Sequence, residues 1–499
     1  MLVMNRLIKL FFNFPHDKAL FNRFRVAIKQ QKETSLMKNE NHFMRKMSSK
    51  HLVTLSLGGV IGTGIFLSSG YLIQEAGAIG TIIAYMVGGA LATLVMMCLG
   101  ELSVQHPDTS SLHMYASKYI HPSVGFTVAW LYWLTWTVAL GSQFITMGIT
   151  LQKWFPQIPI WIWCAIFSGI ILLLNVLDVK IFSVSEFWLS LIKVVALGIF
   201  VILGITAITG VLPVHASSAP LFHNLTANGL FPHGFGAVFI VLLSANFAFS
   251  GTELIGVAAG ETSNPEKNIP KAIKRTLFLL VTLFIGTIVV IGALIPANSK
   301  ALTESPFVII LQNLGIPFAS DIMNFIIFIA ILSGANSGLY AASRMLWSLA
   351  EDGTLPKIFS RLSKHGLPVN GLILTLAGGL LSLFSSIYAE DTVYLALVSI
   401  SGFAVVAVWL SIGVSQLRFR QVFIKQHQLT ELKYRTPGYP LVPWLVIILC
   451  SISLIGIYFD PNQRIALYFG IPFTVLTTLV YQLFYRKQKR SAYDISTVD

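Results

Sequence analysis

Two glycine-rich stretches could expose backbone groups that bind a carboxylate and an ammonium group. The first reads GGVIGTGIF over residues 58–66, and the second reads FAFSGTE over residues 247–253. Each lies in a long apolar run, where a packed helix would avoid glycine because each one costs about 1 kcal/mol relative to alanine. A helix that unwinds there frees main-chain N–H and C=O groups, and glycine lets a ligand approach them because it has no Cβ atom. The predicted chemistry is the binding of a zwitterion by backbone atoms.

The expected contacts follow from helix polarity. Free N–H groups of residues 63–65 would open the second half of the first broken helix and attract a carboxylate. Free carbonyl groups near Val60, Phe247 and Ser250 would accept hydrogen bonds from an α-ammonium group. The predicted substrate-binding residues are Val60, Gly62, Thr63, Gly64, Ile65, Phe247, Ala248, Phe249, Ser250, Gly251 and Glu253.

The composition indicates which elements must position these groups. The 499 residues are 55% hydrophobic and 11% charged, whereas a soluble domain carries about 25% charged residues. So few charges could not cover soluble domains, which excludes a soluble enzyme, a disordered scaffold and a fibrous protein. Cys98, Cys164 and Cys450 lie in apolar stretches, without the spacing of a zinc site or a disulfide framework. The chain is therefore predicted to be an all-α polytopic membrane protein.

Twelve runs are long and apolar enough to cross a bilayer, which needs roughly 20 helical residues. They are expected near residues 50–74, 78–100, 123–153, 160–177, 186–211, 236–260, 275–296, 319–345, 369–388, 393–417, 440–459 and 463–485. If both termini are cytoplasmic, only Lys153, Lys300 and Arg464, of the 34 Lys and Arg residues, fall on the outer side, and Lys193 lies within a span. The net charge of +13 therefore indicates membrane orientation rather than nucleic-acid binding.

Two of these spans carry the glycine-rich stretches, and they lie five helices apart. If one such span is considered alone, close helix packing is the alternative explanation of its glycines, because Gly58 and Gly62 form a GxxxG pair. Two interrupted spans at corresponding positions instead favour inverted repeats, about 49–211 and 236–418, with the binding site of a secondary transporter between them.

The predicted domain organisation has four parts. A basic cytoplasmic tail, a transport core of helices 1–10, helices 11–12 and a second cytoplasmic tail are expected over residues 1–48, 49–418, 440–485 and 486–499. An interfacial amphipathic helix is the alternative for the start of the first tail, where basic and apolar residues alternate in MLVMNRLIKLFFNF. A translation start at Met37, Met44 or Met47 would remove that stretch.

Several motifs extend over nearly the whole chain. They are GGVIGTGIFLSSG, GEL at 100–102, FAFSGTELIGVAAGET with the NP and IP pairs that follow it, and ILSGANSGLYAASRMLWSL at 331–349. They resemble the motifs of amino-acid permeases of the amino acid–polyamine–organocation superfamily. WLYWLTWTVALGS at 130–142, WFPQIPIWIWC at 154–164 and ISGFAVVAVWLSI at 400–412 resemble the S-methylmethionine permeases in particular. The resemblance implies a five-plus-five inverted repeat with discontinuous helices 1 and 6, two additional helices, and uptake coupled to protons.

Ionisable residues within spans are costly and are therefore functional candidates. The resemblance implies that Lys193, in helix 5, takes the place of the cation of sodium-coupled relatives, and a static or snorkelling lysine is the alternative. Glu253 could gain from a helix N-terminus, hold a cationic substrate or relay a proton. Glu261 is expected to act as a gate or to pair with Lys or Arg. Glu101 is interpreted as structural and Arg344 as a headgroup anchor.

Aromatic and polar side chains could supply the remaining cavity walls. Trp133 and Trp136 share a face of helix 3, where packing is the alternative to holding a sulfonium or ammonium group over a ring. The resemblance implies that Phe247 closes over bound substrate, and Asn336 could line the cavity or bond to a neighbouring helix. The polar connection at 106–113, with two histidines and Asp108, is expected to be a solvated loop, with a pH-responsive cluster as the alternative.

The predicted function is proton-coupled uptake of an α-amino acid such as S-methylmethionine, by alternating access, across the cytoplasmic (inner) membrane. An amino-acid sensor or exchanger with the same pocket is the alternative. The chain has no HExxH motif, no P-loop and no GxSxG elbow, so no metal, cofactor or catalytic nucleophile is expected. The expected partners are the amino acid, protons and the lipid bilayer, without nucleic acid.

Overall fold

Most of the chain that the structure describes is helical. The computed structural model describes residues 45, 47–108, 111–177, 179–212, 221–302, 305–381, 390–461 and 463–485. The two predicted tails therefore lie outside the described residues, apart from the last few residues of the first one. Met47, just before the first described helix, forms an isolated backbone bridge with Thr262.

The part of the amino-terminal half that the structure describes forms five spans, as the sequence predicts. Its helices are α3 (Ser49–Val60), α4 (Thr63–Gln105), α5 (Ser111–Tyr119), α6 (Pro122–Gln152), α7 (Ile160–Leu177) and α8 (Val179–Ile208). α4 holds the end of the first span and the whole of the second, because Gly77 interrupts it with φ +75° and ψ 169°. α5 is a short helix between the second and third spans.

The described residues of the carboxyl-terminal half form seven spans. Its helices are α9 (Gly236–Ala248), α10 (Leu254–Val257), α11 (Pro265–Leu294), α12 (Pro306–Asn313), α13 (Ala319–Glu351), α14 (Val369–Leu381), α16 (Glu390–Gln426), α17 (Leu441–Gly456) and α18 (Ile465–Val480). Single 3₁₀ turns lie at His223–Leu225, Ala259–Glu261, Lys300–Leu302, Leu429–Glu431 and Ile457–Phe459, and a π-helical turn lies at Tyr481–Tyr485.

The described helices account for the twelve predicted spans. Eight helical segments are long and apolar enough to cross a membrane, and Ile160–Val176, Gly236–Ala248 and Val369–Leu380 are shorter apolar helices. The remaining span is the first one, which α3 begins and the start of α4 completes.

Two spans are broken where the sequence predicts. α3 ends at Val60 and α4 begins at Thr63, so the first span is interrupted between them. α9 ends at Ala248 and α10 begins at Leu254, which leaves residues 249–253 outside both helices. The prediction of discontinuous helices 1 and 6 is therefore confirmed.

The two breaks lie against each other. Gly251, in the second break, takes φ +105°, a conformation that other residues rarely adopt. A Cβ atom on Gly251 would lie 2.8 Å from the carbonyl carbon of Gly59 and 2.9 Å from the amide nitrogen of Val60. Glycine is therefore required for the backbones of the two broken helices to approach this closely.

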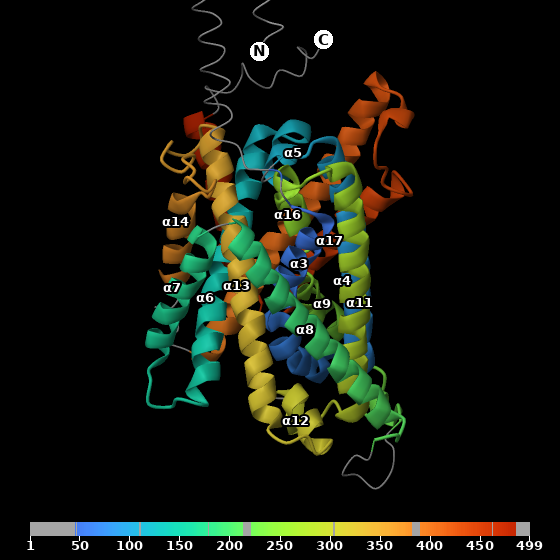
Figure 1. Ribbon diagram of the computed structural model, residues 1–499. Helices are drawn as coiled ribbons and strands as arrows, with labels where there is room; N and C mark the ends of the chain where they lie inside the picture. The colour runs from blue at the N-terminus through green and yellow to red at the C-terminus, as the bar shows by residue number, and fades with distance from the viewer. Residues whose placement is uncertain are drawn as a thin grey trace, which may run out of the picture. The chain divides into compact units, whose positions relative to one another are not determined.

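Three long helices surround the half of the first span that α3 forms. α3 packs against α8, α11 and α13, and α13 also packs along α6. Figure 1 shows α3 (blue) between α13 and α11, with α8 crossing in front of it. Polar groups that these helices bury must find partners within the protein, because the hydrocarbon region offers no water.

Arg344 lies inside the bundle, so the prediction that it anchors at the lipid headgroups is wrong. Its side chain is 1% exposed, its Nε atom donates to Glu261 Oε1 over 2.6 Å, and its guanidinium carbon lies 3.4 Å from the centre of the Tyr340 ring. This burial arises because α13 continues past the apolar run to Glu351, about two turns beyond Arg344. Glu261 thus pairs with an arginine, and its predicted role as a gate stays a prediction.

Glu101 forms a second buried ion pair. Its carboxylate is fully buried and accepts hydrogen bonds from Arg420 Nε over 2.6 Å and from the backbone N–H of Thr436 over 2.6 Å. These bonds join α4, α16 and the segment before α17, which fits the structural role that the sequence suggested.

The connection between the second and third spans is more buried than predicted. His113, on α5, is fully buried, and its Nε2 atom lies 3.3 Å from Asp352 Oδ2. His106 shares a hydrogen bond of 2.9 Å with the Tyr119 hydroxyl, and its burial, together with nearby Lys118, lowers the pKa of the His106 ring to about 4. The expectation of a solvated loop is wrong for these two histidines because α5 packs against α6 and α16.

Candidate substrate-binding site

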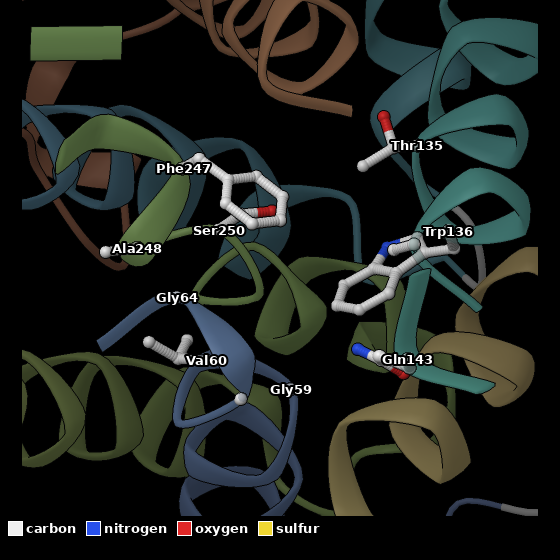
Figure 2. Close-up of a pocket in the computed structure, with 11 residues that line it drawn as sticks. Gly59, Val60, Gly64, Thr135, Trp136, Gln143, Phe247, Ala248 and Ser250 are labelled. Carbon is white, nitrogen blue, oxygen red and sulfur yellow. The ribbon is translucent and has the colours of Figure 1, made fainter. Parts of the chain in front are cut away.

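A cavity lies where the two breaks face α6. Figure 2 shows Trp136 and Gln143 of α6 across the cavity from the broken helices. The lining residues are Gly59, Val60, Gly62, Gly64, Thr135, Trp136, Ala139, Gln143, Phe247, Ala248 and Ser250. The free volume, about 20 Å³, holds about one water molecule, so an amino acid can enter only if the walls move apart.

The first break presents hydrogen-bond donors at this cavity. Residues 63–65 form the first turn of α4, and the N–H groups of a first turn have no acceptor within the helix. Gly62, at the N-cap position, has no side chain that could bond to them. Together with the helix dipole, these N–H groups could bind an anion such as a carboxylate, and this predicted role stays a prediction.

Carbonyl groups at the two breaks supply acceptors. The Val60 carbonyl accepts from the N–H of Gly62 over 2.8 Å, and the Phe247 carbonyl accepts from the N–H of Ser250 over 2.9 Å. Each carbonyl oxygen has a second lone pair that could accept from a ligand. Because Val60, Phe247 and Ser250 all line the cavity, the predicted ammonium contacts are possible there, and they stay a prediction.

Several predicted residues lie near the cavity but outside its wall. They are Ile65, Phe249, Gly251 and Glu253 of the substrate-binding set, and Trp133 and Asn336 of the cavity candidates, whereas the side chain of Thr63 lies outside the described parts of the structure. Phe249 is fully buried against Tyr85 and Phe284. Trp133 Nε1 donates to Thr375 Oγ1 over 3.0 Å. These two aromatic side chains therefore pack between helices.

Glu253 ties the second break to two other helices. Its carboxylate is fully buried and accepts hydrogen bonds from the N–H of Gly251 over 3.1 Å, from the Tyr132 hydroxyl over 3.3 Å and from Trp409 Nε1 over 3.2 Å. α10 has only four residues, so an N–H of the break itself holds this carboxylate. The predicted contact with a cationic substrate would require Glu253 to leave these partners.

Sequence reasoning missed three lining residues of α6, which are Thr135, Ala139 and Gln143. Gln143 is 6% exposed, and its Oε1 atom has no hydrogen-bond partner among the described residues. A signal was present, because Trp136, Ala139 and Gln143 follow one another at spacings of three and four residues. That spacing places them on one helix face.

Lys193 lies beside the first break and outside the cavity wall. Its side chain is fully buried, and its Nζ atom donates to the carbonyl oxygens of Gly58 over 2.8 Å and Ile61 over 2.9 Å. It also donates to Ser333 Oγ over 2.9 Å. The ammonium group thus satisfies carbonyl groups that the end of α3 leaves without helical partners, as a bound cation would.

Asn336 contacts Glu186, a buried carboxylate that the sequence analysis did not single out. Asn336 Nδ2 donates to Glu186 Oε2 over 2.8 Å, and Asn336 Oδ1 accepts from Asn175 Nδ2 over 2.7 Å. Ser333 Oγ also donates to Glu186. Glu186 precedes Lys193 by seven residues, or two helical turns, and this shared face was a signal that could have identified it.

Sequence similarity identifies the family. The model of the family described as amino acid permease matches residues 51–493. The chain belongs to the amino acid permease family. A putative histidine permease of Bacillus subtilis is 49% identical to this permease over 440 residues, which cover 88% of the chain and 93% of the relative. The amino-acid permease RocE of the same organism is 43% identical over 455 residues, which cover 91% and 97%.

A solved structure shares the fold of this permease. It is MHP1, a transporter of the nucleobase-cation-symport-1 family in a closed conformation with bromovinylhydantoin bound. The TM-score is 0.51 at 16% identity, over 90% of this chain and 97% of MHP1, so the likeness concerns the fold alone. The permease therefore has the five-plus-five architecture with two additional helices that the resemblance implied. It is a multi-pass membrane transport protein and not an enzyme. The narrower likeness to S-methylmethionine permeases stays a prediction.

Proposed function

We propose that this permease imports an α-amino acid together with protons across the cytoplasmic membrane, by alternating access, with both termini in the cytoplasm. The observation that carries the proposal is the uncapped first turn of α4, which opens at the same cavity as the carbonyl groups of the second break. Donors and acceptors placed this way suit the carboxylate and the ammonium group of one molecule. The clustering of Lys and Arg in alternate connections supports the orientation.

The cavity lining favours a substrate whose side chain carries no net charge. None of its 11 residues is acidic or basic. The Gln143 amide offers a donor and an acceptor, and its Oε1 atom has no partner among the described residues. A neutral imidazole also has one donor and one acceptor, and the relative at 49% identity is named as a putative histidine permease. Histidine is therefore the first substrate that we propose.

S-methylmethionine is the second candidate. Trp136 lines the cavity and is almost fully buried, and a desolvated cation over an aromatic face gains about 2 kcal/mol. The sulfonium group is cationic, however, and the lining contains no acidic side chain to neutralise it. Trp136 would have to bind this group alone, which ranks S-methylmethionine after histidine.

Lys193 is the proposed coupling residue. Burial of an ammonium group is costly, and here its hydrogen bonds to Gly58, Ile61 and Ser333 offset that cost. Loss of the proton would weaken the bonds to two carbonyl groups, that of Gly58 in α3 and that of Ile61 in the break that follows α3. It would therefore favour movement of α3, the cytoplasmic half of helix 1 in the proposed orientation. Phe247 is proposed as the lid over the substrate.

Uptake by purified permease in proteoliposomes tests the proposal. Labelled histidine, S-methylmethionine and lysine are offered with and without an imposed pH gradient, acidic outside. We expect histidine to accumulate only with the gradient, by up to about tenfold per pH unit if one proton accompanies each substrate. Lys193→Gln should retain exchange of labelled for unlabelled substrate and lose accumulation.

The same assay separates the alternatives. Exchange by the wild-type protein without any accumulation would contradict proton coupling and support an exchanger. Binding detected as a higher melting temperature, without transport of either kind, would support a sensor.

A further inference from the structure

The permease buries a carboxylate that the substrate cavity does not use. Glu186, on α8, is 1% exposed, and it accepts hydrogen bonds from Ser190 Oγ over 3.3 Å, from Asn336 Nδ2 over 2.8 Å and from Ser333 Oγ. The bonds from Ser333 and Asn336 connect Glu186 to α13. Each of its two carboxylate oxygens accepts at least one hydrogen bond. An ionisable side chain held at this depth in a span is a candidate for function rather than for packing alone.

Ser333 connects Glu186 to Lys193. Its hydroxyl oxygen accepts a hydrogen bond from Lys193 Nζ over 2.9 Å, and its hydroxyl hydrogen is donated to Glu186 Oε1. The two ionisable residues lie seven positions apart on α8, which is about 10 Å along the helix axis. Their side chains reach toward each other, and the hydroxyl group bridges the remaining distance.

Among the described residues, Lys193 is the one charged side chain that acts on Glu186, and Glu186 is the one that acts on Lys193. The other groups that face the carboxylate are neutral, and they are Ser190 of α8, Ser333, Asn336 and Ser337 of α13, and Gly58 of α3. Besides burial itself, the charge of each member of the pair therefore depends on the charge of the other.

The broken helix rests directly on this pair. A Cβ atom at Gly58 would overlap Glu186 Oε1, and it would lie 2.9 Å from Ser337 Oγ. The carbonyl oxygen of the same Gly58 accepts from Lys193 Nζ over 2.8 Å. One turn of α3 is thus held by Lys193 through a hydrogen bond and by Glu186 through close packing. A change of charge on either side chain changes how tightly α3 is held.

We propose that Glu186 is a second proton-carrying group of the transport cycle, which receives the proton of Lys193 through Ser333 and releases it toward the cytoplasm. This inference rests on the proton coupling proposed above. In the transfer, Lys193 Nζ gives a proton to Ser333 Oγ while that hydroxyl gives its own proton to the Glu186 carboxylate. One N–H bond breaks and one carboxyl O–H bond forms, so an ion pair becomes a neutral amine and a neutral carboxylic acid.

The transfer has a direct effect on α3. A neutral amine has two hydrogen-bond donors in place of three, and Lys193 has acceptors at Gly58, Ile61 and Ser333. The proton that moves is the one donated to Ser333, so the two remaining N–H groups still reach Gly58 and Ile61, but these two bonds weaken because their donor is no longer charged. Glu186 lies nearer than Lys193 to the start of α8, which is cytoplasmic in the proposed orientation, so it is the member of the pair that can pass the proton inward.

Glu186→Gln tests the inference in proteoliposomes containing the full chain, because the amide keeps the shape of the carboxylate but cannot take up the proton. Labelled histidine, or whichever amino acid of the panel the wild-type protein transports, is the probe. We expect exchange without a gradient to stay within about threefold of wild type, whereas accumulation under a gradient of one pH unit falls from about tenfold to about onefold. We also expect uptake to lose its dependence on external pH.

Three further variants keep the test decisive if Glu186→Gln is poorly folded. Ser333→Ala removes the bridging hydroxyl and should also lose accumulation while retaining exchange, and Ser333→Thr should restore accumulation. Ser190→Ala, which removes a bond to the same carboxylate but leaves the bridge, should keep accumulation within about twofold of wild type. Accumulation that survives in Glu186→Gln or in Ser333→Ala would overturn this inference. A wild-type protein that fails to accumulate substrate would instead overturn the proposed proton coupling itself.

Discussion

The ammonium nitrogen of Lys193 lies 2.8 Å from the carbonyl oxygen of Gly58, in the last turn of α3 before helix 1 is interrupted. The last carbonyl groups of a helix lack N–H partners, and within a bilayer no water replaces them. Lys193 supplies that partner with a group whose charge a proton can switch. The same turn of α3 touches Glu186 and, through Gly59 and Val60, borders the substrate cavity. In the proposed mechanism, protonation and substrate binding therefore act on one short piece of helix 1.

Gly58→Ala should destabilise the permease and impair transport. The new methyl group would overlap Glu186 Oε1, and overfilling a packed site costs about 1–3 kcal/mol. Gly198→Ala is the matched control, because a Cβ atom at this other helical glycine would meet nothing within 4 Å. Melting temperatures in detergent should fall for the first variant and stay the same or rise for the second. Equal melting temperatures would contradict the close packing of α3 on Glu186.

Arg344→Ala should be one of the most destabilising single substitutions in this chain. It leaves the Glu261 carboxylate buried without its ion partner, and breaking a buried pair from one side costs about 3–5 kcal/mol. Lys433→Ala is the control, since it breaks a half-exposed pair with Glu266 and should cost less than about 1 kcal/mol. Unfolding of both variants in detergent checks the difference. Arg344→Ala protein as stable as Lys433→Ala protein would show that the first pair is not buried as described.

The broken helices could be predicted from the sequence because clustered glycines weaken a helix within an apolar run. The break beside Gly62 and the break at residues 249–253 both lie inside the stretches that glycine spacing marked. The burial of Arg344 could not be predicted in this way, because the end of an apolar run does not mark the end of a helix. α13 extends to Glu351, and the arginine turns inward to reach Glu261.

Side chains that act through neighbours distant in the chain were harder to predict. Glu186 lies at the edge of a hydrophobic run, and only the packing of α8 on α13 reveals that Ser333 connects it to Lys193. The spacing of Gln143 from Trp136 places the two residues on one helix face, but only the cavity shows that this face lies opposite the broken helices. Contacts of this kind depend on tertiary packing, which residue periodicity does not encode.

Gln143→Leu should weaken the binding of histidine more than the binding of S-methylmethionine. Leucine has a similar volume but cannot bond to the imidazole, whereas the sulfonium side chain has no N–H group to lose. We expect the KM for histidine to rise by about tenfold, the equivalent of about 1.4 kcal/mol, with less than about a threefold change for S-methylmethionine. Competition against labelled substrate measures both values. An equal rise in KM for the two compounds would argue that Gln143 supports the cavity wall and does not bond to the substrate side chain.

Thermal stability should fall as the pH drops from about 6.5 to about 4, and His106 should account for part of the fall. Burial lowers the pKa of His106 from 6.5 to about 4 in the folded chain. Between these values the unfolded chain binds a proton that the folded chain does not, so acid favours unfolding. The contribution of His106 to the free energy of unfolding is therefore fully present above pH 6.5, where the ring is neutral in both states. It is lost by about pH 4. Melting temperatures across this range should depend less steeply on pH in His106→Phe, and an unchanged slope would contradict the burial of this ring.

The most direct test concerns the backbone groups that the two breaks release toward one cavity. Thermal stabilisation of the purified permease is measured with histidine, with histamine, which lacks the carboxylate, and with imidazolepropionate, which lacks the ammonium group. We predict that histidine raises the melting temperature and that each analogue, at the same concentration, loses most of the effect, since each leaves one set of backbone groups without its partner. If histamine and imidazolepropionate stabilise the protein as well as histidine does, the broken helices do not hold the amino-acid head group.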